Sequence, residues 1–442
     1  MVSLRMIARF GLLWASLALP PAAVQAQFIL ATNNGTIAIV RYTGSDDAVT
    51  IPDTTNGLPI TGIEEAAFFD CSSLTNVTIG TNVTIVGVEA FWHCTNLTSV
   101  MIGTSVTNIG TMAFYQCTRL AHVTIPDSVI SISNGAFLAC TSLCNAMIGS
   151  GLASIGIGAF AICPSLTNIA MSASNLAYSS VGGVLFDKSQ TTLVEYPGGI
   201  PKGSYAIPDG TTSIGSRAFI SCGNLTSVTI GNGVTNIGDD AFAGCGHLAS
   251  VMIGSGVTSI GQETFEDCTN LTRITIGNRV TNIHAGAFFD CRSLTSVTIP
   301  DSVTTIEEAT FGWCTSLTAV YSVGNAPNGG SGSSVFYNNA ANATVYYRPG
   351  TTNWGSTFGG LPAVPWNPHV RGDANFGIGT NGFGFAFTNA GNPMVVVEAC
   401  TNLASPAWVP LATNALVGGS SQFGDPQWTN YPYRFYRFGM PW

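Results

Sequence analysis

The chain has 442 residues, of which 46% are hydrophobic and only 8% are charged, with a formal net charge of −9. The hydrophobic residues suffice for a large core, but the charged fraction lies far below the ~25% of ordinary soluble domains, so the exterior must consist largely of Thr, Ser, Asn and Gly. The negative charge disfavours a nucleic-acid partner, because phosphate binding requires a basic face.

The first 26 residues have the pattern of a secretory signal peptide. Arg5 and Arg9 precede an apolar run from Phe10 to Leu19, and small residues stand at positions −3 and −1 of a cleavage site after Ala26. A membrane span needs about 20 apolar residues, so this run is too short to be one. We expect a secreted or cell-surface protein that begins at Gln27, a residue that gives no indication of a lipid anchor.

Ten of the twelve cysteines lie at a 23-residue spacing, in two blocks of five. They are Cys71, Cys94, Cys117, Cys140 and Cys163, then Cys222, Cys245, Cys268, Cys291 and Cys314. A Phe stands three residues before each of them and a Leu three residues after it. A unit this short cannot bury its own apolar side chains, whereas stacked units share one continuous core. The spacing predicts a leucine-rich solenoid over residues 63–322, with an N-terminal cap over 27–62.

Each repeat reads A-F-x-x-C-x-x-L-T-x-V-T-I-G-x-x-V-T-x-I-G. The L-T-x-V-T-I part alternates as a strand does, with Val and Ile facing inward, and V-T-x-I-G is a second extended piece. We expect the A-F-x-x-C part to form a helical or 3₁₀ turn, and neighbouring coils to lie ~4.8 Å apart. The predicted fold is a β-rich solenoid with a parallel sheet on one face and short turns on the other.

These residues have the same order as the consensus of the BspA-type, or Treponema pallidum-type, bacterial leucine-rich repeats, and residues 51–321 resemble that family. The resemblance implies a secreted or cell-surface protein connected with adhesion and with protein or matrix binding, and it implies no catalysis. The insertion at about 174–210 resembles the atypical, hairpin-bearing repeat of the family. Residues 343–368 resemble its closing segment.

The repeat spacing is lost in the C-terminal part of the chain. We expect residues 323–368 to close the solenoid and residues 369–442 to form a small all-β module, because short strand-like segments such as GFGFAFT and YRFYRF are separated by Gly, Asn and Pro. A segment of about 70 residues is long enough for a small sandwich or barrel. The module could cap the solenoid, attach the protein to a surface or bind a ligand, and the sequence leaves these roles open.

The cysteine spacing favours buried free thiols. An exported protein with twelve cysteines first suggests disulfides. Stacked side chains would hold the Cβ atoms of neighbouring coils ~4.8 Å apart, however, whereas a disulfide needs about 3.5–4.5 Å. We therefore expect a column of small buried side chains with weak S–H donors. Cys144 and Cys400 lie off the spacing, and Cys144 is expected to face outward or sideways, where its thiol could be reactive.

The outward positions of the first strand lie five and seven residues after each spaced cysteine, and they form the candidate binding face. This face comprises Asn76, Thr78, Ser99, Met101, His122, Thr124, Asn145, Met147, Ser227, Thr229, Ser250, Met252, Arg273, Thr275, Ser296, Thr298 and Tyr321. Thr and Ser at these positions also simply favour β structure and solubility. The functional alternative is a broad, flat surface for a protein or glycan partner.

No motif in the sequence indicates catalysis, a metal or a cofactor. The five histidines fall at different phases of the repeat, and the acidic residues form short pairs that are typical of solvated turns. Gly377–Gly382 matches G-x-G-x-x-G, but a strand-like segment follows where a dinucleotide site requires a helix. The RGD triplet at Arg371–Asp373 is too short a match to indicate integrin binding.

The sequence therefore predicts an exported, non-enzymatic scaffold for adhesion and protein–protein contact at the cell surface. We expect no cofactor and no membrane span. The alternative is a glycan-binding protein, or an accessory of a polymer-degrading system, in which the aromatic C-terminal module binds or attaches. Neither the partner nor the oligomeric state follows from the sequence.

Overall fold

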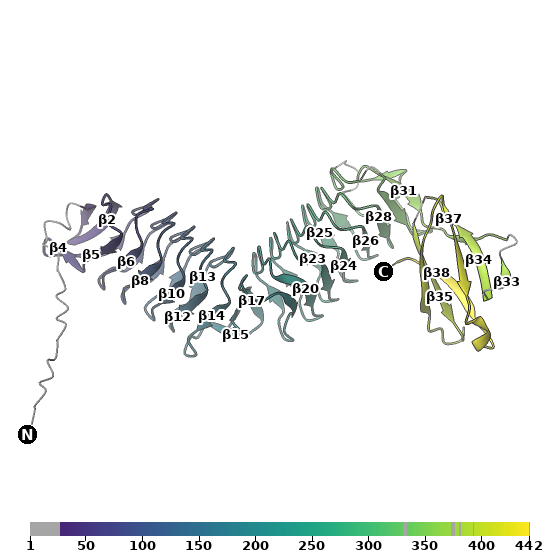
Figure 1. Cartoon of the computed structure of the whole chain (residues 1–442), viewed down its shortest axis with the longest axis horizontal. Helices are drawn as coiled ribbons and strands as arrows, with labels where there is room; N and C mark the ends of the chain where they lie inside the picture. The colour runs from purple at the N-terminus through teal and green to yellow at the C-terminus, as the bar shows by residue number, and fades with distance from the viewer. Residues whose placement is uncertain are drawn as a thin grey trace, which may run out of the picture.

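The computed structural model describes residues 27–329, 334–340, 342–372, 376–379, 382–391 and 393–441. The coils form an elongated solenoid with two arms, and a β module follows at its C-terminal end (Figure 1). The expected signal peptide lies outside the described residues, as do Asp373 of the RGD triplet and two residues of the glycine-rich loop.

Two parallel series of strands run along the first arm. The first series is β3 (Ala48–Thr50), β6 (Asn76–Thr78), β8 (Ser99–Met101), β10 (His122–Ile125), β12 (Asn145–Ile148) and β14 (Asn168–Met171). The second series is β5 (Leu58–Ile63), β7 (Ile85–Val86), β9 (Asn108–Ile109), β11 (Ser131–Ile132) and β13 (Ser154–Ile155). His122 pairs with Asn145, and Asn145 with Asn168, so that equivalent residues of successive coils lie side by side. The predicted in-register stacking is confirmed.

The second arm repeats this arrangement. Its first series is β18 (Gly203–Ala206), β20 (Leu225–Ile230), β22 (Ser250–Ile253), β24 (Arg273–Thr275), β26 (Ser296–Ile299) and β28 (Ala319–Ser322). Its second series is β19 (Ser213–Ile214), β21 (Asn236–Ile237), β23 (Ser259–Ile260), β25 (Asn282–Ile283) and β27 (Thr305–Ile306). The predicted β-rich solenoid, with a parallel sheet formed by the first strand of each coil, is confirmed in both arms.

A column of stacked phenylalanines fills the centre of each arm. The rings of Phe91, Phe114 and Phe137 are fully buried and nearly parallel, with centroids 5.0 and 5.1 Å apart. The repeated leucines, such as Leu97 and Leu120, are also fully buried. Burial of each such side chain contributes roughly 1.5–3 kcal/mol, which explains how a chain with so few charges is held together.

The A-F-x-x-C segment is a succession of hydrogen-bonded turns rather than the expected helical or 3₁₀ turn. The N–H groups of Ala66, Phe68 and Asp70 donate to carbonyls of the next coil at 2.7–3.0 Å, where a helix would keep them within the segment. Ala66 and Asp70 have φ of 54° and 57°, which turns alternate N–H groups toward the neighbouring coil. In the described part of the chain, the one helix is the 3₁₀ turn η1 (Trp428–Asn430), and no helix there could span a membrane.

The regular cysteines tie successive coils together. The Sγ of Cys94 donates to the carbonyl of Phe68 at 3.1 Å, and the Sγ of Cys245 donates to that of Phe219 at 3.0 Å. The same bond to the phenylalanine 26 residues earlier recurs along both arms. Cysteine therefore recurs at this position because its side chain fills a small buried site and its S–H reaches a carbonyl of the preceding coil. Cys144 is exposed, as expected, and Cys400 is buried.

The insertion between the two cysteine blocks joins the arms. The strands β15 (Tyr178–Val181) and β16 (Val184–Asp187) form an antiparallel hairpin, and β17 (Thr192–Glu195) pairs antiparallel with β16 and parallel with β19. The two arms meet at an angle here (Figure 1). Glu195 stands where most other coils carry alanine, and burial raises the pKa of its carboxyl group to about 8. The junction thus contains a buried ionisable group in a column that otherwise consists of alanine and, in two coils, threonine.

Both ends of the solenoid are closed by additional strands. The strands β1 (Phe28–Asn33) and β2 (Thr36–Tyr42) form an antiparallel pair at the N-terminal end, where the short β4 (Thr54–Thr55) pairs with β5. At the other end β29 (Thr344–Tyr347) and β31 (Leu361–Pro365) extend the sheet of β28, and β30 (Thr357–Phe358) pairs with β31. These strands therefore cover the apolar core at each end of the solenoid.

The C-terminal module consists of two antiparallel sheets. One contains β32 (His369–Val370), β33 (Gly377–Gly379), β34 (Gly382–Thr388) and β37 (Ser420–Asp425), and the other contains β35 (Met394–Cys400), β36 (Val409–Ala415) and β38 (Phe435–Gly439). Phe387, Val395 and Val397 are fully buried in its core. This core is continuous with Tyr321 and Tyr346 of the solenoid, so the module is docked on the last coils.

Candidate binding surfaces

The strand face, defined as the outward positions of the first strand series, is open along most of the solenoid. Its exposed members are Asn76, Ser99, Met101, His122, Thr124, Met147, Thr229, Met252, Arg273 and Thr275. Its half-buried members are Thr78, Asn145, Ser227, Ser250, Ser296 and Thr298. The intervening Val and Ile residues, such as Val123 and Ile125, are buried in the core. The alternation in the sequence therefore places these side chains where the prediction put them, except at the C-terminal end.

The prediction that Tyr321 belongs to the exposed face is wrong, because only 1% of the Tyr321 side chain is exposed. The C-terminal module covers it: the N–H of Met394 donates to the Tyr321 hydroxyl at 2.7 Å, and the ring stacks on Tyr346 at 5.5 Å. Burial raises the pKa of Tyr321. The module also reaches Thr298, whose hydroxyl donates to the carbonyl of Pro441 at 2.9 Å. The open part of the strand face therefore ends near β26.

Many of the threonines beside this face have a structural role. The hydroxyls of Thr98 and Thr272 donate to carbonyls of the preceding coil at 3.0 and 3.1 Å. A second threonine column does the same next to the second strand series, as Thr107 does at 3.1 Å. These hydroxyl groups are engaged within the solenoid, so the abundance of threonine alone does not indicate a ligand.

Three methionines distinguish the strand face from an ordinary solvated sheet. Met101, Met147 and Met252 are 66%, 51% and 56% exposed, on a surface otherwise made of small polar groups. An exposed methionine side chain is apolar and forms no strong hydrogen bond with water. Its flexible, polarizable thioether is suited to contact with a partner surface. The thiol of Cys144 is exposed one residue before β12 and donates to the carbonyl of Ser142 at 3.2 Å.

The histidines are dispersed, as expected. His93 pairs with Asp70 at 2.7 Å and His284 with Glu307 at 3.0 Å, both between neighbouring coils. His122 and His247 are exposed at different phases of the repeat, and His369 lies in the C-terminal module. They therefore do not converge on one site.

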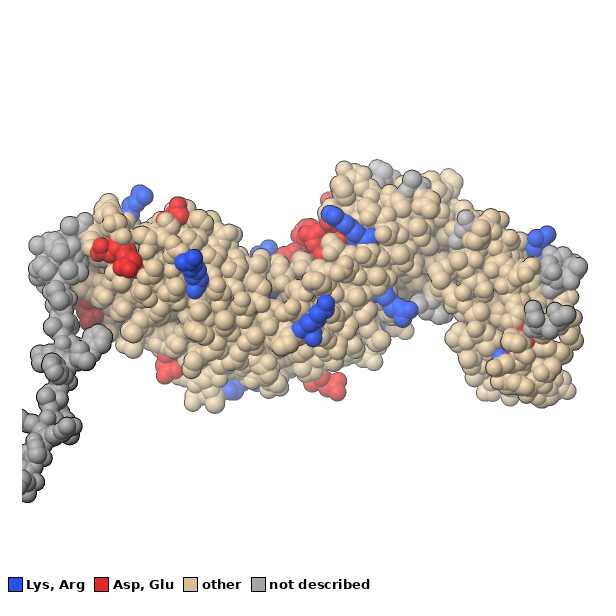
Figure 2. Space-filling view, viewed as in Figure 1, with Lys and Arg blue, Asp and Glu red and all other residues tan. Residues whose placement is uncertain are grey.

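An acidic cluster on the second arm was not anticipated from the sequence. Asp240, Glu263 and Glu266 bring ligand oxygens within 4.8 Å of one another, a separation from which they could hold a cation. Burial, and then the neighbouring carboxylates, raise the pKa of Glu266 to about 6. Arg217 pairs with Asp240 at 3.0 Å and offsets part of the charge. Figure 2 shows acidic side chains gathered near the middle of a surface that carries few charges. The sequence did contain a signal for this cluster, because Asp240 and Glu263 are 23 residues apart and therefore occupy the same position in neighbouring coils.

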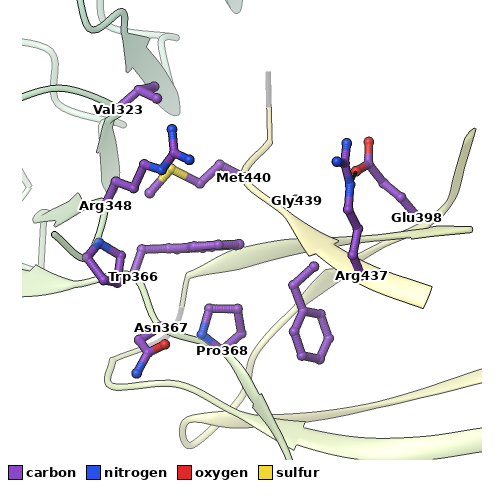
Figure 3. Close-up of a pocket in the computed structure, with 11 residues that line it drawn as sticks. Val323, Arg348, Trp366, Asn367, Pro368, Glu398, Arg437, Gly439 and Met440 are labelled. Atoms are coloured by element: carbon purple, nitrogen blue, oxygen red, sulfur yellow. Dashed lines mark hydrogen bonds and ion pairs between the residues drawn. The ribbon is translucent and has the colours of Figure 1, made fainter. Parts of the chain in front are cut away.

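A pocket of about 470 Å³ lies between the end of the solenoid and the C-terminal module. Figure 3 shows Arg348 on its solenoid side and the ion pair of Arg437 with Glu398 on its module side. The other lining residues are Val323, Pro349, Trp366, Asn367, Pro368, Phe438, Gly439 and Met440. No pattern in the sequence could have indicated this pocket, because residues far apart in the chain form it only when the module docks.

Comparison with protein families matches residues 61–191 and 203–318, more than half of the chain, to the BspA type leucine-rich repeat region. The chain belongs to this family. The pattern of Cys, Leu and Phe that first indicated the resemblance is the same one that fills the core. No curated protein matches the chain.

Solved structures of three bacterial proteins resemble this fold. A leucine-rich cell surface protein of Faecalibacterium prausnitzii is 28% identical, with a TM-score of 0.53, and the match covers 67% of this chain and 93% of that protein. The pneumococcal vaccine antigen PcpA has a TM-score of 0.60 at 18% identity, with coverage of 77% and 96%. A leucine-rich repeat protein of Eubacterium ventriosum has a TM-score of 0.54 at 21% identity, with coverage of 79% and 95%. The last two similarities concern the fold alone.

Proposed function

We propose that this chain is an exported, non-enzymatic scaffold that binds a protein partner through its strand face, and that this contact serves adhesion at the cell surface. Three exposed methionines on a flat, otherwise polar sheet are the observation that carries the proposal. The signal-peptide pattern and the likeness to a cell surface protein support the location. The C-terminal module, docked beyond the open face, first contacts β26, so it leaves the strands from β6 to β24 open to a partner.

Paired triple variants test the use of this face. Residues 27–442 are immobilised, and binding to purified matrix proteins (fibronectin, laminin, collagen and mucin) is measured by biolayer interferometry. In the test variant, Met101, Met147 and Met252 are replaced by Glu. In the control, Ile85, Ile130 and Ile157 are replaced by Glu; these residues lie outside the strand face and are about equally exposed, at 51%, 52% and 51%.

The proposal expects at least one matrix protein to bind, and its affinity to fall tenfold or more in the methionine variant only. A fall of equal size in both variants would show that the contact is unspecific. Binding that is unchanged in the methionine variant would place the contact elsewhere on the molecule.

The second candidate function is glycan binding, and the pocket at the base of the C-terminal module favours it. Protein pockets for small ligands have volumes of ≈ 300–1,000 Å³ and occur preferentially at domain interfaces, as this one does. A glycan array probed with residues 27–442 tests this candidate. Retention of defined saccharides supports it, and a blank array contradicts it.

A further inference from the structure

The pocket between the solenoid and the C-terminal module, called the junction pocket here, carries an uncompensated positive charge. Among the described residues, the structure gives the guanidinium of Arg348 no ion pair or hydrogen bond, and the side chain is exposed where it lines the pocket. Its backbone N–H donates to the carbonyl of Ser322 at 3.0 Å, which fixes the start of the side chain. On a chain with a net charge of −9, a free guanidinium in a concave site is an unusual feature. It favours an anionic ligand with a planar acceptor such as a carboxylate.

The opposite side of the junction pocket is polar and firmly held. Arg437 donates from Nε to Glu398 at 2.6 Å, and its guanidinium lies over the ring of Trp408, 4.6 Å from the ring centre. Glu398 is 8% exposed, and Gly439 lies close to it: a Cβ added at Gly439 would lie 3.2 Å from the carboxyl group. The ion pair therefore offers its remaining N–H groups and oxygen lone pairs in fixed directions. Such fixed donors and acceptors are suited to ligand hydroxyl groups.

The remaining lining is apolar. Trp366 is 9% exposed, and its ring N–H is engaged with the carbonyl of Met394 at 3.3 Å, so it contributes ring surface rather than a hydrogen bond to the pocket. Phe438, Pro368 and Met440 add further apolar surface. A matching ligand would combine a carboxylate, several hydroxyl groups and an apolar face.

We propose that the junction pocket binds a carboxylate-bearing sugar residue, such as a uronic acid unit of an acidic polysaccharide. The carboxylate pairs with Arg348, the hydroxyl groups meet the Arg437–Glu398 pair and Asn367, and the carbon face of the ring packs against the apolar lining. This inference rests on the second candidate function, glycan binding, and is independent of the strand face. A free carboxylate or a peptide C-terminus carries the same charge but lacks the ring.

Two sugars that differ in one group test the proposal. Binding of methyl β-glucuronide and methyl β-glucoside to residues 27–442 is followed by saturation-transfer NMR and titration calorimetry, with sodium acetate as a third ligand. The variants are Arg348→Ala and Arg348→Lys, and the control is Arg119→Ala, an exposed arginine on the first arm. Thermal unfolding confirms that each variant is folded.

The proposal expects the glucuronide to bind at least fivefold more tightly than the glucoside or acetate. Arg348→Ala abolishes this preference, Arg348→Lys restores part of it, and Arg119→Ala leaves it unchanged. Equal binding of the two sugars, unaffected by Arg348→Ala, would overturn the acidic-sugar assignment while leaving glycan binding intact. Acetate binding as tight as that of the glucuronide would show that the ring is not recognised. Failure of both sugars to bind would overturn the assignment, and a blank array in addition would remove the glycan-binding function.

Discussion

The solenoid and the C-terminal module bury their cores in different ways. In the solenoid, the same side chain type recurs at most inner positions from coil to coil, so that Phe114 packs against Phe91 and Phe137 at nearly the same distance and angle. In the module, Phe385, Phe387 and Phe423 meet at varied angles between two sheets. A solenoid coil therefore depends on its two neighbours, whereas the module depends on residues that are distant in the sequence.

The largest expected effect comes from removing one ring in the middle of a phenylalanine column. Phe114→Ala should lower the free energy of unfolding of the first arm by about 3–5 kcal/mol, because the lost ring leaves a cavity between two coils. Phe387→Ala should destabilise the module by a similar amount but leave the first arm unchanged. Urea unfolding measures the stability that each variant loses. Hydrogen exchange shows whether the first arm or the module loses protection. Equal loss of protection in arm and module after Phe114→Ala would contradict the independence of the two cores.

The buried Glu195 should make the junction of the two arms sensitive to pH. The folded chain retains the proton on this carboxyl group up to about pH 8, whereas its ordinary pKa is 4.5, so the free energy of unfolding falls as the pH rises between these values. The slope is at most about 1.4 kcal/mol per pH unit. The buried thiols of Cys163 and Cys222 add no negative charge beside it, because their pKa values are raised well above the ordinary value and they stay neutral.

Glu195→Gln should therefore have little effect at pH 4.5 and should stabilise the chain at pH 8 by a few kcal/mol at most. Thermal unfolding across this pH range measures the difference, and Glu308→Gln serves as a control at an exposed turn of the second arm. If the stability of the Glu195→Gln variant fell with pH as steeply as that of the parent, the pH dependence could not be assigned to Glu195.

Tyr321→Phe tests the contact between solenoid and module. The substitution removes the acceptor of the Met394 N–H and leaves that group unpaired in a partly buried site, at a cost of about 1–2 kcal/mol. The loss should appear as faster hydrogen exchange at the base of the module, with the first arm unaffected. Unchanged exchange at Met394 would show that the hydroxyl is not what holds the module in place.

The smallest expected effect concerns the cysteine column. Cys140→Ala removes an S–H donor and a little volume between two coils, and should cost about 1 kcal/mol. Cys71→Ala should cost less, because Cys71 is half-buried at the first coil and its weak contact is to Phe69 of its own coil, at 3.9 Å. Urea midpoints of the two variants give the comparison, and a larger loss for Cys71→Ala would contradict the proposed role of the column.

The regular part of the fold could be predicted because a 23-residue spacing determines which side chains stack. The inward Leu, Phe and Cys positions and the outward strand positions follow from this spacing alone. The turn geometry did not follow, because most coils carry a non-glycine residue such as Ala66 or Asp70 at the positions with positive φ, and glycine stands there in only a few coils, as Gly135, Gly158, Gly244 and Gly286. Burial of Tyr321 and the junction pocket also could not be predicted. Both depend on how the module docks, and docking leaves no periodic pattern in the sequence.

Methionine oxidation, followed by mass spectrometry, tests whether the strand face is open and whether the module closes its C-terminal end. With dilute hydrogen peroxide, the exposed Met101, Met147 and Met252 should be oxidised at least tenfold faster than Met440, which is 5% exposed at the junction. Equal oxidation of Met440, or protection of the three strand-face methionines in the isolated protein, would contradict the account.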